Sequence, residues 1–525
     1  MGLQANSIAA GVGAAVRNVQ FQPTAQVIPR KILVIGTYNP SLSGSVVNNV
    51  PVQVLSAEDA ADRFGSGYMI HRLVDRAYIG SNGVETWVIP QAEPGGSSAA
   101  TGDVDFAGST GVQAGTVRLY IAGSDASFTI AAGTDEDGLA TAMVAAIDAD
   151  ATLPVTAAVN GTTTSQVDIT AKSDGPWGND ISIRFNILAG ESLPTGVTAA
   201  VTDMSGGAGV PDIGDALNGL GTGDNANEDF FTDVVHGYGN ETATLDAISA
   251  YVGAGNDFIG LYDKLVHRPF RVLQGDTGAG SGGFTAVRAI ADADARKLDR
   301  ASGVVSVPGS ASHPAEIAAQ AIGVMARTNN DRAEQSYIGL VLTGIDPGPT
   351  GDRWTSDYDN RDIAVRSGVS PTLVANGAVT LQNVVSFYHP DNVPVDSNGY
   401  RSMRNISIIQ NMLFNVALNF EQEKWQGISI VEDTARVGNA TSRQKARDTD
   451  SVIDDLVALA RSFASRAWLY NDSFTIDRLR SGNNVTIRSG TNGFDSVFPV
   501  ILSGEGGILD TVIEFDTSIA VLLNN

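Results

Sequence analysis

The chain has 525 residues, of which 33 are basic and 58 acidic, so its formal net charge is −25. A chain of this length holds several domains, and its 43% hydrophobic and 17% charged residues are typical of a globular protein rather than a disordered one. It contains no cysteine, which excludes a disulfide scaffold, a thiolate zinc site and a cysteine nucleophile.

The charge is unevenly distributed. Residues 1–96 hold six basic and six acidic residues, 97–210 and 211–390 each carry a net charge of −10, and 391–525 carry −5. An acidic middle favours solvated surfaces that do not associate, whereas balanced segments suit packing against other copies. We expect no direct contact with nucleic acid, which requires clustered Lys and Arg, and no membrane insertion, because no apolar run approaches about 20 residues. The N-terminus lacks the pattern of a signal peptide.

The first 96 residues predict an extended arm followed by a β-α-β unit. Residues 1–30 read as the arm, and 31–36 form an apolar run typical of a buried parallel strand. Ser56, with Asp59 three residues on, predicts a helix start, and a second helix follows at 69–77. Residues 85–90 read as the return strand, so the unit belongs to an α/β layer.

Residues 97–210 predict a β-rich domain inserted into the α/β chain. Gly-rich stretches flank this region, and one helix is expected at 139–147. Short alternating segments, as in a β-sandwich or small barrel, are predicted at 117–121, 127–131, 155–159, 167–171, 181–187 and 197–204.

After residue 211 helices and strands alternate again, as in the first 96 residues, and from residue 371 the pattern changes to a hairpin followed by long helices. Helices are predicted at 242–252, 284–298 and 313–328, and strands at 270–273, 303–307 and 337–343. Within 371–388, Asn376-Gly377 is a strong hairpin signal. The C-terminal part predicts two long helices and three strands, at 400–425, 441–470, 485–488, 498–502 and 510–523.

The search for catalytic chemistry finds no site. No two of the five histidines have the spacing of a zinc motif, and the glycines at 65–67 do not form a nucleophile elbow. The glycines at 278–283 lack a preceding strand and the Lys-Ser/Thr of a phosphate loop, so they read as a flexible loop. Acidic residues 352–362 fit a helix start better than a Ca²⁺ site, and His389 fits a turn at a strand end. We therefore predict that the chain is not an enzyme and holds no metal or cofactor.

Several ordered motifs resemble the contractile tail sheath proteins of phages, most of all the branch found in Mu-like phages. In the first part of the chain they are PRKILVIGT (29–37), PVQVLSAEDAADRFGSG (51–67) and MIHRLVDRA (69–77). The later ones are LPVTAAV (153–159), VDITAK (167–172), GND (178–180) and VTLQNVVSFY (379–388). No single motif is diagnostic, but their order along the chain is.

The resemblance implies a domain organisation with extended terminal arms. It comprises an N-terminal arm (1–30), an α/β, subtilisin-like sheath domain in two parts (31–96 and 211–388), an inserted β-sandwich-like domain (97–210), an α+β C-terminal domain (389–509) and a terminal arm strand (510–525). No Asp/His/Ser triad context accompanies the subtilisin-like shape, so a protease is not expected.

The resemblance also implies a structural function in the virion. Subunits would assemble in the host cytoplasm as stacked hexameric rings around an inner tube, contract, and drive the tube through the host envelope. Implied partners are other copies of the chain, the tail tube protein, and baseplate and tail terminator proteins. The arms would add strands to neighbouring subunits, through the candidates Ile8, Val12, Val16, Val19, Phe21, Val512, Ile513, Phe515, Ile519 and Val521.

Two points stay open at this stage. The basic residues Arg443, Lys445 and Arg447 could face the tube, although a solvated first helical turn is favoured. The alternative functions are a secreted acidic hydrolase with a β accessory domain and a surface-layer or adhesin protein.

Overall fold

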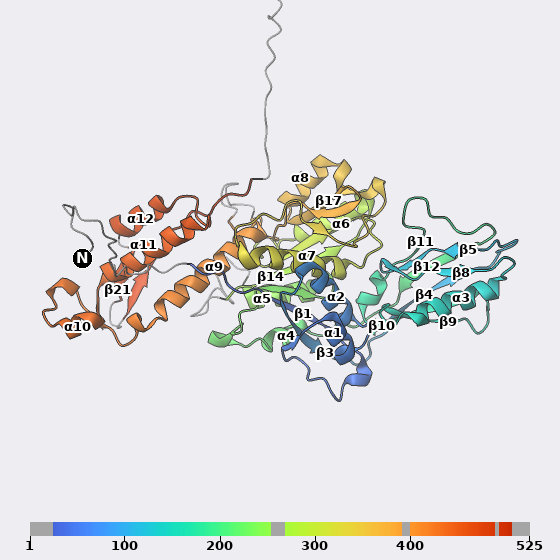
Figure 1. Cartoon of the computed structure of the whole chain (residues 1–525), viewed down its shortest axis with the longest axis horizontal. Helices are drawn as coiled ribbons and strands as arrows, with labels where there is room; N and C mark the ends of the chain where they lie inside the picture. The colour runs from blue at the N-terminus through green and yellow to red at the C-terminus, as the bar shows by residue number, and fades with distance from the viewer. Residues whose placement is uncertain (1–24, 254–267, 391–398, 483, 489–492, 507–525) are drawn as a thin grey trace, which may run out of the picture. The chain divides into compact units, whose positions relative to one another are not determined.

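The computed structural model describes residues 25–253, 268–390, 399–482, 484–488 and 493–506 (Figure 1). Contacts within the chain divide it into a larger unit, residues 27–414 with 504–525, and a smaller unit, residues 1–26 with 415–503. Within the described ranges no helix is both long and apolar enough to cross a membrane. The chain is a mixed α/β protein with several parts, as expected.

The larger unit is built on a nine-stranded mixed sheet of order β16-β18-β17-β15-β14-β13-β1-β3-β2. Six neighbouring strands run parallel, namely β1 (Lys31–Thr37), β3 (Glu85–Gln91), β13 (Asp233–His236), β14 (Arg271–Asp276), β15 (Ser302–Ser306) and β17 (Val369–Ala375). Antiparallel strands close both edges, namely β2 (Val52–Val54), β18 (Ala378–Leu381) and β16 (Val341–Leu342).

The predicted β-α-β unit is present. Between β1 and β3 the chain forms α1 (Ala57–Phe64) and α2 (Met69–Ser81), and the Ser56 side chain caps α1 by accepting from the Asp59 N–H. Helix α2 crosses α7 (Pro314–Asp331) at glycines. A Cβ atom on Gly80 would lie 2.3 Å from the Gln320 carbonyl oxygen, so only glycine permits this approach.

Buried ion pairs fix the same core. Glu316, fully buried in the first turn of α7, accepts from Arg72 Nε at 2.7 Å and from Arg76 Nε at 3.0 Å. Near the C-terminal end of α7, fully buried Arg271 pairs with Asp233 across β13 and β14 and donates to Asn329. Removing one partner of such a pair leaves an uncompensated charge, which makes these contacts costly to lose.

The remaining helices of the larger unit flank the sheet. They are α4 (Ile213–Asn218), α5 (Thr242–Val252), α6 (Gly280–Ala291) and α8 (Tyr358–Arg366). The predicted hairpin is confirmed, since Asn376 and Gly377 join β17 to β18 with φ of 52° and 78°. The strand expected at 337–343 is mostly a turn, because only β16 pairs there.

Residues 97–210 form small antiparallel sheets, close to the predicted segments. Their largest sheet has the order β12-β4-β10-β9, built from β12 (Ala200–Ser205), β4 (Ala99–Asp105), β10 (Gln166–Asp174) and β9 (Val155–Val159). Helix α3 (Glu136–Ala149) packs on β9 and β10. The short strands are β5 (Gly115–Val117), β6 (Leu119–Ile121), β7 (Ser124–Asp125), β8 (Phe128–Ile130) and β11 (Ile183–Phe185). Strand β4 was not predicted, because its sequence is rich in Gly, Ala and Asp and lacks an alternating apolar pattern.

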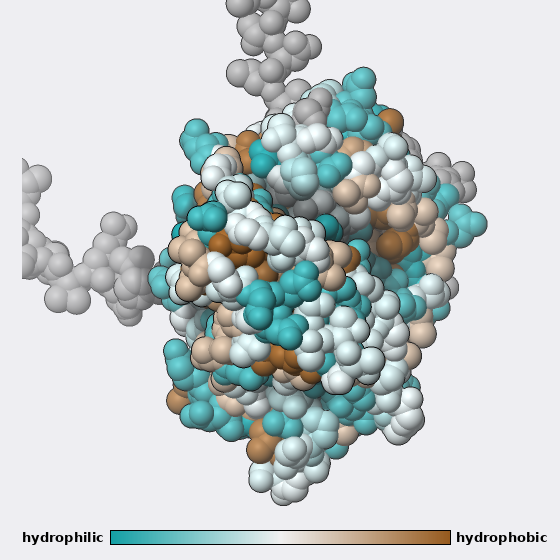
Figure 2. All heavy atoms as spheres, turned by 90° about the vertical axis from the view of Figure 1, so that its right-hand side faces the viewer, coloured by the Kyte–Doolittle hydropathy of each residue, from teal (hydrophilic) through white to brown (hydrophobic). Residues whose placement is uncertain are grey.

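Viewed from the side of residues 97–210, the surface is largely polar or neutral, with hydrophobic residues scattered over it (Figure 2). This agrees with the net charge of −10 on this segment. A surface of this kind is well solvated rather than suited to stable association.

The smaller unit differs from the prediction of one long helix at 441–470. The chain forms α10 (Ala440–Lys445), then β20 (Ala446–Arg447), then α11 (Thr449–Ser465). Asp448 starts α11 by accepting from the Ser451 N–H at 2.9 Å, so a capping residue interrupts the helical pattern.

Other elements of the smaller unit are short. They include α12 (Asp472–Ser481), β19 (Ser429–Ile430), β21 (Val485–Ile487) and β22 (Phe494–Ser496). Helix α9 (Met403–Phe420), predicted at 400–425, has residues in both units. The strand expected at 498–502 is only an isolated bridge between Leu469 and Leu502, and that expected at 510–523 lies outside the described residues.

Candidate functional site

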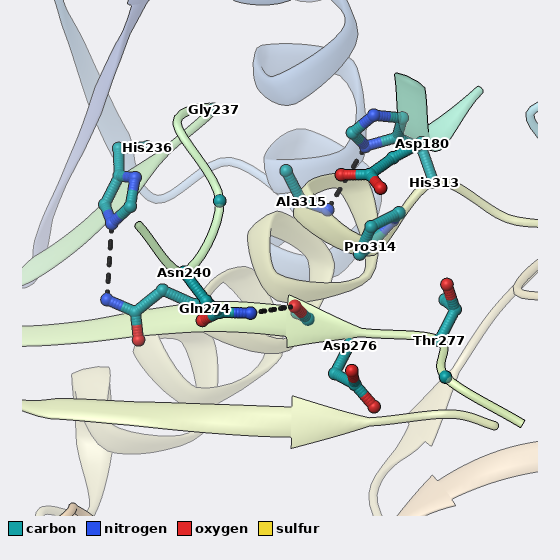
Figure 3. A pocket seen from close by; sticks show the side chains of 13 residues that line it. Asp180, His236, Gly237, Asn240, Gln274, Asp276, Thr277, His313, Pro314 and Ala315 are labelled. Carbon is teal, nitrogen blue, oxygen red and sulfur yellow. Dashed lines mark hydrogen bonds between the residues drawn. The ribbon is translucent and has the colours of Figure 1, made fainter. Parts of the chain in front are cut away.

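A cavity of about 350 Å³ opens in the larger unit at the carboxyl ends of β13 and β14, beside the start of α7 (Figure 3). Ligand sites of open α/β sheets lie at this edge, so this is where chemistry is most expected. Sequence reasoning missed the cavity because β13 is only four residues long and its pattern does not stand out. Its polar lining includes Asp180, His236, Asn240, Gln274, Asp276 and His313.

His236 is a neutral, structural residue of this cavity. It is 1% exposed, and burial lowers its pKa to about 4. Its Nδ1 accepts from the Tyr238 N–H at 3.2 Å, which places the proton on Nε2. The atom drawn 3.2 Å from this nitrogen is the Gln274 amide nitrogen (Figure 3). With the oxygen and nitrogen of the carboxamide interchanged, the Gln274 oxygen, which has no other partner among the described residues, accepts from His236 Nε2.

His313 caps α7 and holds residues 97–210 against the start of this helix. Its Nδ1 accepts from the Ala315 N–H, and its Nε2 lies 3.0 Å from the Trp177 carbonyl oxygen. The Trp177 and His313 rings stack with centroids 3.7 Å apart. Burial lowers the pKa of His313, so the ring is neutral and both of its nitrogens are used by the fold.

Asp276 is the titratable acid of the cavity. Burial raises its pKa to about 6, although Ser306 Oγ donates to its carboxylate at 3.0 Å. Asp180 is a second carboxyl group in the lining. Two carboxyl groups in one cleft are what the hydrolase alternative requires.

The two histidines of the cavity do not act as catalytic bases. Both histidines have their two ring nitrogens committed to neighbouring groups, so neither is placed to activate a nucleophile. Among the described residues, no group of three or more His, Asp or Glu side chains is arranged to hold a metal ion. The arrangement supports a hydrogen-bonded structural cavity.

The interpretation of the glycines at 278–283 is wrong in two respects. Strand β14 ends at Asp276, so a strand does precede the cluster, and α6 begins at Gly280, so residues 280–283 are helical rather than a flexible loop. The strand was predicted to end at residue 273, three residues too early. The Lys-Ser/Thr pair of a phosphate loop is still missing from the sequence.

The acidic patch at 352–362 is a helix start, as predicted. Asp357 is the N-cap of α8 and accepts from the Asn360 N–H at 2.9 Å. The strand-end turn predicted at His389 is not present: the residue lies in an irregular segment beyond β18, with its Nε2 2.9 Å from Asp292 Oδ1.

The three basic residues proposed to face the tube bind carbonyl groups of their own unit. Arg443 Nε donates to Val437 O at 2.8 Å, and Lys445 Nζ donates to Glu423 O at 3.0 Å. Arg447 donates to Lys424 O at 2.8 Å, and its guanidinium lies over the Trp425 ring. These contacts give all three a structural role, and tube contact stays a prediction.

The ten arm candidates, from Ile8 to Phe21 and from Val512 to Val521, lie outside the described residues. The smaller unit exposes four apolar side chains on segments that are hydrogen-bonded to one another in pairs. They are Tyr470 at 76%, Ile487 at 46%, Val497 at 63% and Ile501 at 41% exposure. The Tyr470 N–H donates to Ile501 O, and the Val497 N–H donates to Asn484 O beside β21.

Comparison with known proteins finds a tail sheath relative. The chain is 32% identical over 226 residues to the Mu-like prophage FluMu tail sheath protein of Haemophilus influenzae. The match covers 42% of this chain and 45% of that protein, so it spans less than half of either. It confirms the resemblance to Mu-like tail sheath proteins that the motifs indicate. No family model matches the chain.

Two solved structures of sheath tail proteins show weak similarity to this chain. The sheath tail protein of Desulfitobacterium hafniense has a TM-score of 0.41 and 11% identity, covering 93% of this chain and 100% of that one. The sheath tail protein Lin1278 of Listeria innocua has a TM-score of 0.43 and 10% identity, covering 92% and 94%. These similarities are distant, and the sequence match carries the comparison.

Proposed function

We propose that this chain is the sheath subunit of a contractile phage tail or a related injection machine. The observation that carries the proposal is the 32% identity over 226 residues to a Mu-like prophage tail sheath protein. The relative is named for a structural part of a tail, in agreement with the prediction that the chain is not an enzyme. In this proposal the subunits form stacked hexameric rings around a tube, contract, and act in the virion after assembly in the host cytoplasm.

The charge of the two units supports this assignment. Counted over the whole sequence, the smaller unit holds 11 basic and 11 acidic residues, so the larger unit carries the entire net charge of −25. Like charges repel, which disfavours close packing of the larger units and favours their exposure to solvent. We assign the outer surface of the sheath to the larger unit, including the inserted domain at 97–210.

The smaller unit offers a place for the terminal arms to bind. Its sheet of β21 and β22 has only two short strands, which is marginal without further pairing. Exposed Ile487 and Val497 lie on or next to this sheet. Added strands from the arms of neighbouring copies would cover these side chains and complete the sheet.

Truncation tests the arm model directly. We expect the full chain to form long polymers, and deletion of residues 1–20 or 511–525 to abolish them while both units keep their thermal unfolding transitions. Alanine substitution of exposed Tyr358 in the larger unit is the matched control, because it removes a surface aromatic without touching either arm. If both truncated proteins polymerise as the full chain does, the arms are not the connections.

The tube contacts predicted for Arg443, Lys445 and Arg447 are tested separately. Conversion of all three to Gln should weaken co-assembly with a tail tube protein if they face the tube. The triple substitution should leave co-assembly with the tube protein unchanged if the three side chains only bind carbonyl groups of the smaller unit.

A further inference from the structure

Helix α9 buries polar side chains where an amphipathic helix normally buries apolar ones. Ser407, Asn411, Asn415 and Asn419 follow one another at intervals of four residues, and none is more than 3% exposed. Residues four apart lie on one face of a helix, about 6 Å apart. Burying a carboxamide is costly unless its hydrogen bonds are made, so the partners of these side chains explain why they are there.

For Asn411 and Asn415 the partners are backbone groups of residues 25–30, the segment that leads into β1. Ser407 instead accepts from the Arg30 guanidinium, and Asn419 donates to Asp455. Three asparagine side chains accept the N–H groups of alternate residues of this segment, namely Asn415 from Gln26 at 2.7 Å, Asn411 from Ile28 at 2.8 Å and Asn330 from Arg30 at 3.3 Å. Within the smaller unit, Asn415 also donates to the Gln26 carbonyl oxygen at 2.7 Å. One carboxamide thus pairs with both backbone groups of Gln26, as a neighbouring strand would.

The spacing of the contacts made by Asn411 and Asn415 follows from elementary geometry, whereas Asn330 belongs to α7. Alternate residues of an extended chain lie about 6.6 Å apart, close to the roughly 6 Å between helix residues four apart. The intervening positions need no partner. No described residue accepts the Val27 N–H, and residue 29 is a proline, which has no N–H.

The end of the segment is held by a buried charge in the larger unit. Arg30 is 1% exposed, and its guanidinium donates to Gln410 Oε1 at 2.5 Å and to Ser407 Oγ. Burial lowers the pKa of Arg30 to about 10, so it stays charged at neutral pH. Gln410 in turn donates to the carbonyl groups of Thr232 and Pro269, just before β13 and β14.

We propose that Asn411 and Asn415, with Asn330, anchor the N-terminal arm of the sheath subunit. They hold the backbone of residues 26–30 in register, so that tension applied to the arm by a neighbouring subunit is shared among several hydrogen bonds before it reaches β1. The bonds run across the segment, so pulling along it loads them together. The inference rests on the proposed function, because the arm carries tension only in a polymer. The asparagines are positioning residues, which act on the arm through the backbone.

The alternation of used and unused N–H groups supplies a matched pair of variants. Gln26→Pro removes an N–H that Asn415 accepts, whereas Val27→Pro removes one that no described residue accepts. Both changes add one proline to the same segment, and the Gln26 side chain is exposed. Asn415→Ala removes the same contact from the other side.

We expect amide hydrogen exchange at Ile28 and Arg30 in the full-length protein to be about tenfold faster in Gln26→Pro and Asn415→Ala than in Val27→Pro. Under the same conditions, polymers of Gln26→Pro and Asn415→Ala should be several-fold shorter than those of Val27→Pro, with unchanged thermal unfolding of both units. Equal polymer lengths in the two proline variants would overturn the anchor. So would a lower unfolding temperature in Gln26→Pro alone, because the asparagines would then be part of the folded core only.

The two proposals fail differently. If the unsubstituted chain forms no polymer, the sheath function is wrong, and with it the anchoring of an arm under tension. If the unsubstituted chain polymerises and exchange at Ile28 is the same in all variants, only the anchor is wrong.

Discussion

The two units of this chain are stabilised in different ways. The larger unit buries a nine-stranded sheet and whole ion pairs, such as Glu316 with Arg72, and carries all of the net charge. The smaller unit is electrically neutral, has short strands, and leaves Tyr470 and Val497 largely exposed. The difference separates a strongly charged unit with a large buried sheet from a neutral unit with short strands and exposed apolar side chains.

The buried charges of the larger unit give the largest expected effect. Glu316→Gln leaves the Arg72 and Arg76 guanidinium groups without a counter-charge. We therefore expect the free energy of unfolding of the larger unit, measured in urea, to fall by about 3–5 kcal/mol. Asp362→Asn, which breaks the exposed pair with Arg366, is the control and should cost less than about 0.5 kcal/mol. Similar losses in the two variants would show that burial does not set the value of these pairs.

The acid of the cavity gives the larger unit a distinct pH dependence. The pKa of Asp276 is raised to about 6, so the folded state holds this proton more tightly than the unfolded state. The stability contributed by the protonated group is full below about pH 4 and is lost as the pH rises to about 6.

Asp276→Asn removes this dependence. We expect it to stabilise the larger unit by about 2 kcal/mol at pH 7 and to have little effect at pH 4, as measured by urea unfolding at both values. A variant less stable than the parent at pH 7 would show that the carboxylate is favoured in the fold.

The smaller unit should respond to pH in the opposite sense. Partial burial disfavours the charged form of Asp448, but hydrogen bonds from Ser451 and Thr434 outweigh it and hold its pKa at about 2. The stability that the ionised Asp448 contributes to the smaller unit is therefore present above about pH 4 and is lost as the pH falls towards 2.

Asp448→Ala tests this cap. The free energy of unfolding of the smaller unit should fall by about 1 kcal/mol at pH 7 in this variant, and the unfolding transition of the larger unit should not change. Asp454→Ala, an exposed change later in α11, is the control. A loss of the same size in both variants would contradict the capping role.

Parts of the fold with strong local signals were predictable from the sequence. The apolar run at 31–36, the Ser56 cap and the Asn376-Gly377 turn each depend on neighbouring residues, and each is present. The long helix expected at 441–470 is interrupted because the Asp448 cap competes with the helical pattern.

The cavity and the asparagine contacts were not predictable. His236, Asp276 and His313 come from separate elements that only the parallel sheet brings together. The pairing of Asn415 with Gln26 joins residues 389 positions apart, which no local pattern can indicate. The proposed function rests on the similarity to a tail sheath protein, and the residues of the arms remain predictions.

Ionic strength gives the smallest expected effect and addresses the charge difference itself. At about 0.05 M salt, repulsion among larger units of charge −25 should oppose assembly, and at about 0.5 M it should be screened. We expect the minimum protein concentration for polymer formation, measured by light scattering, to fall a few-fold with added salt. A rise would indicate that attraction between opposite charges holds the copies together.

Electron microscopy of the purified full-length chain tests the central claim most directly. The sheath assignment predicts rings or long tubes of regular diameter formed by this protein alone or around a tail tube. Single, separate particles at every concentration, with or without a tube, would contradict it.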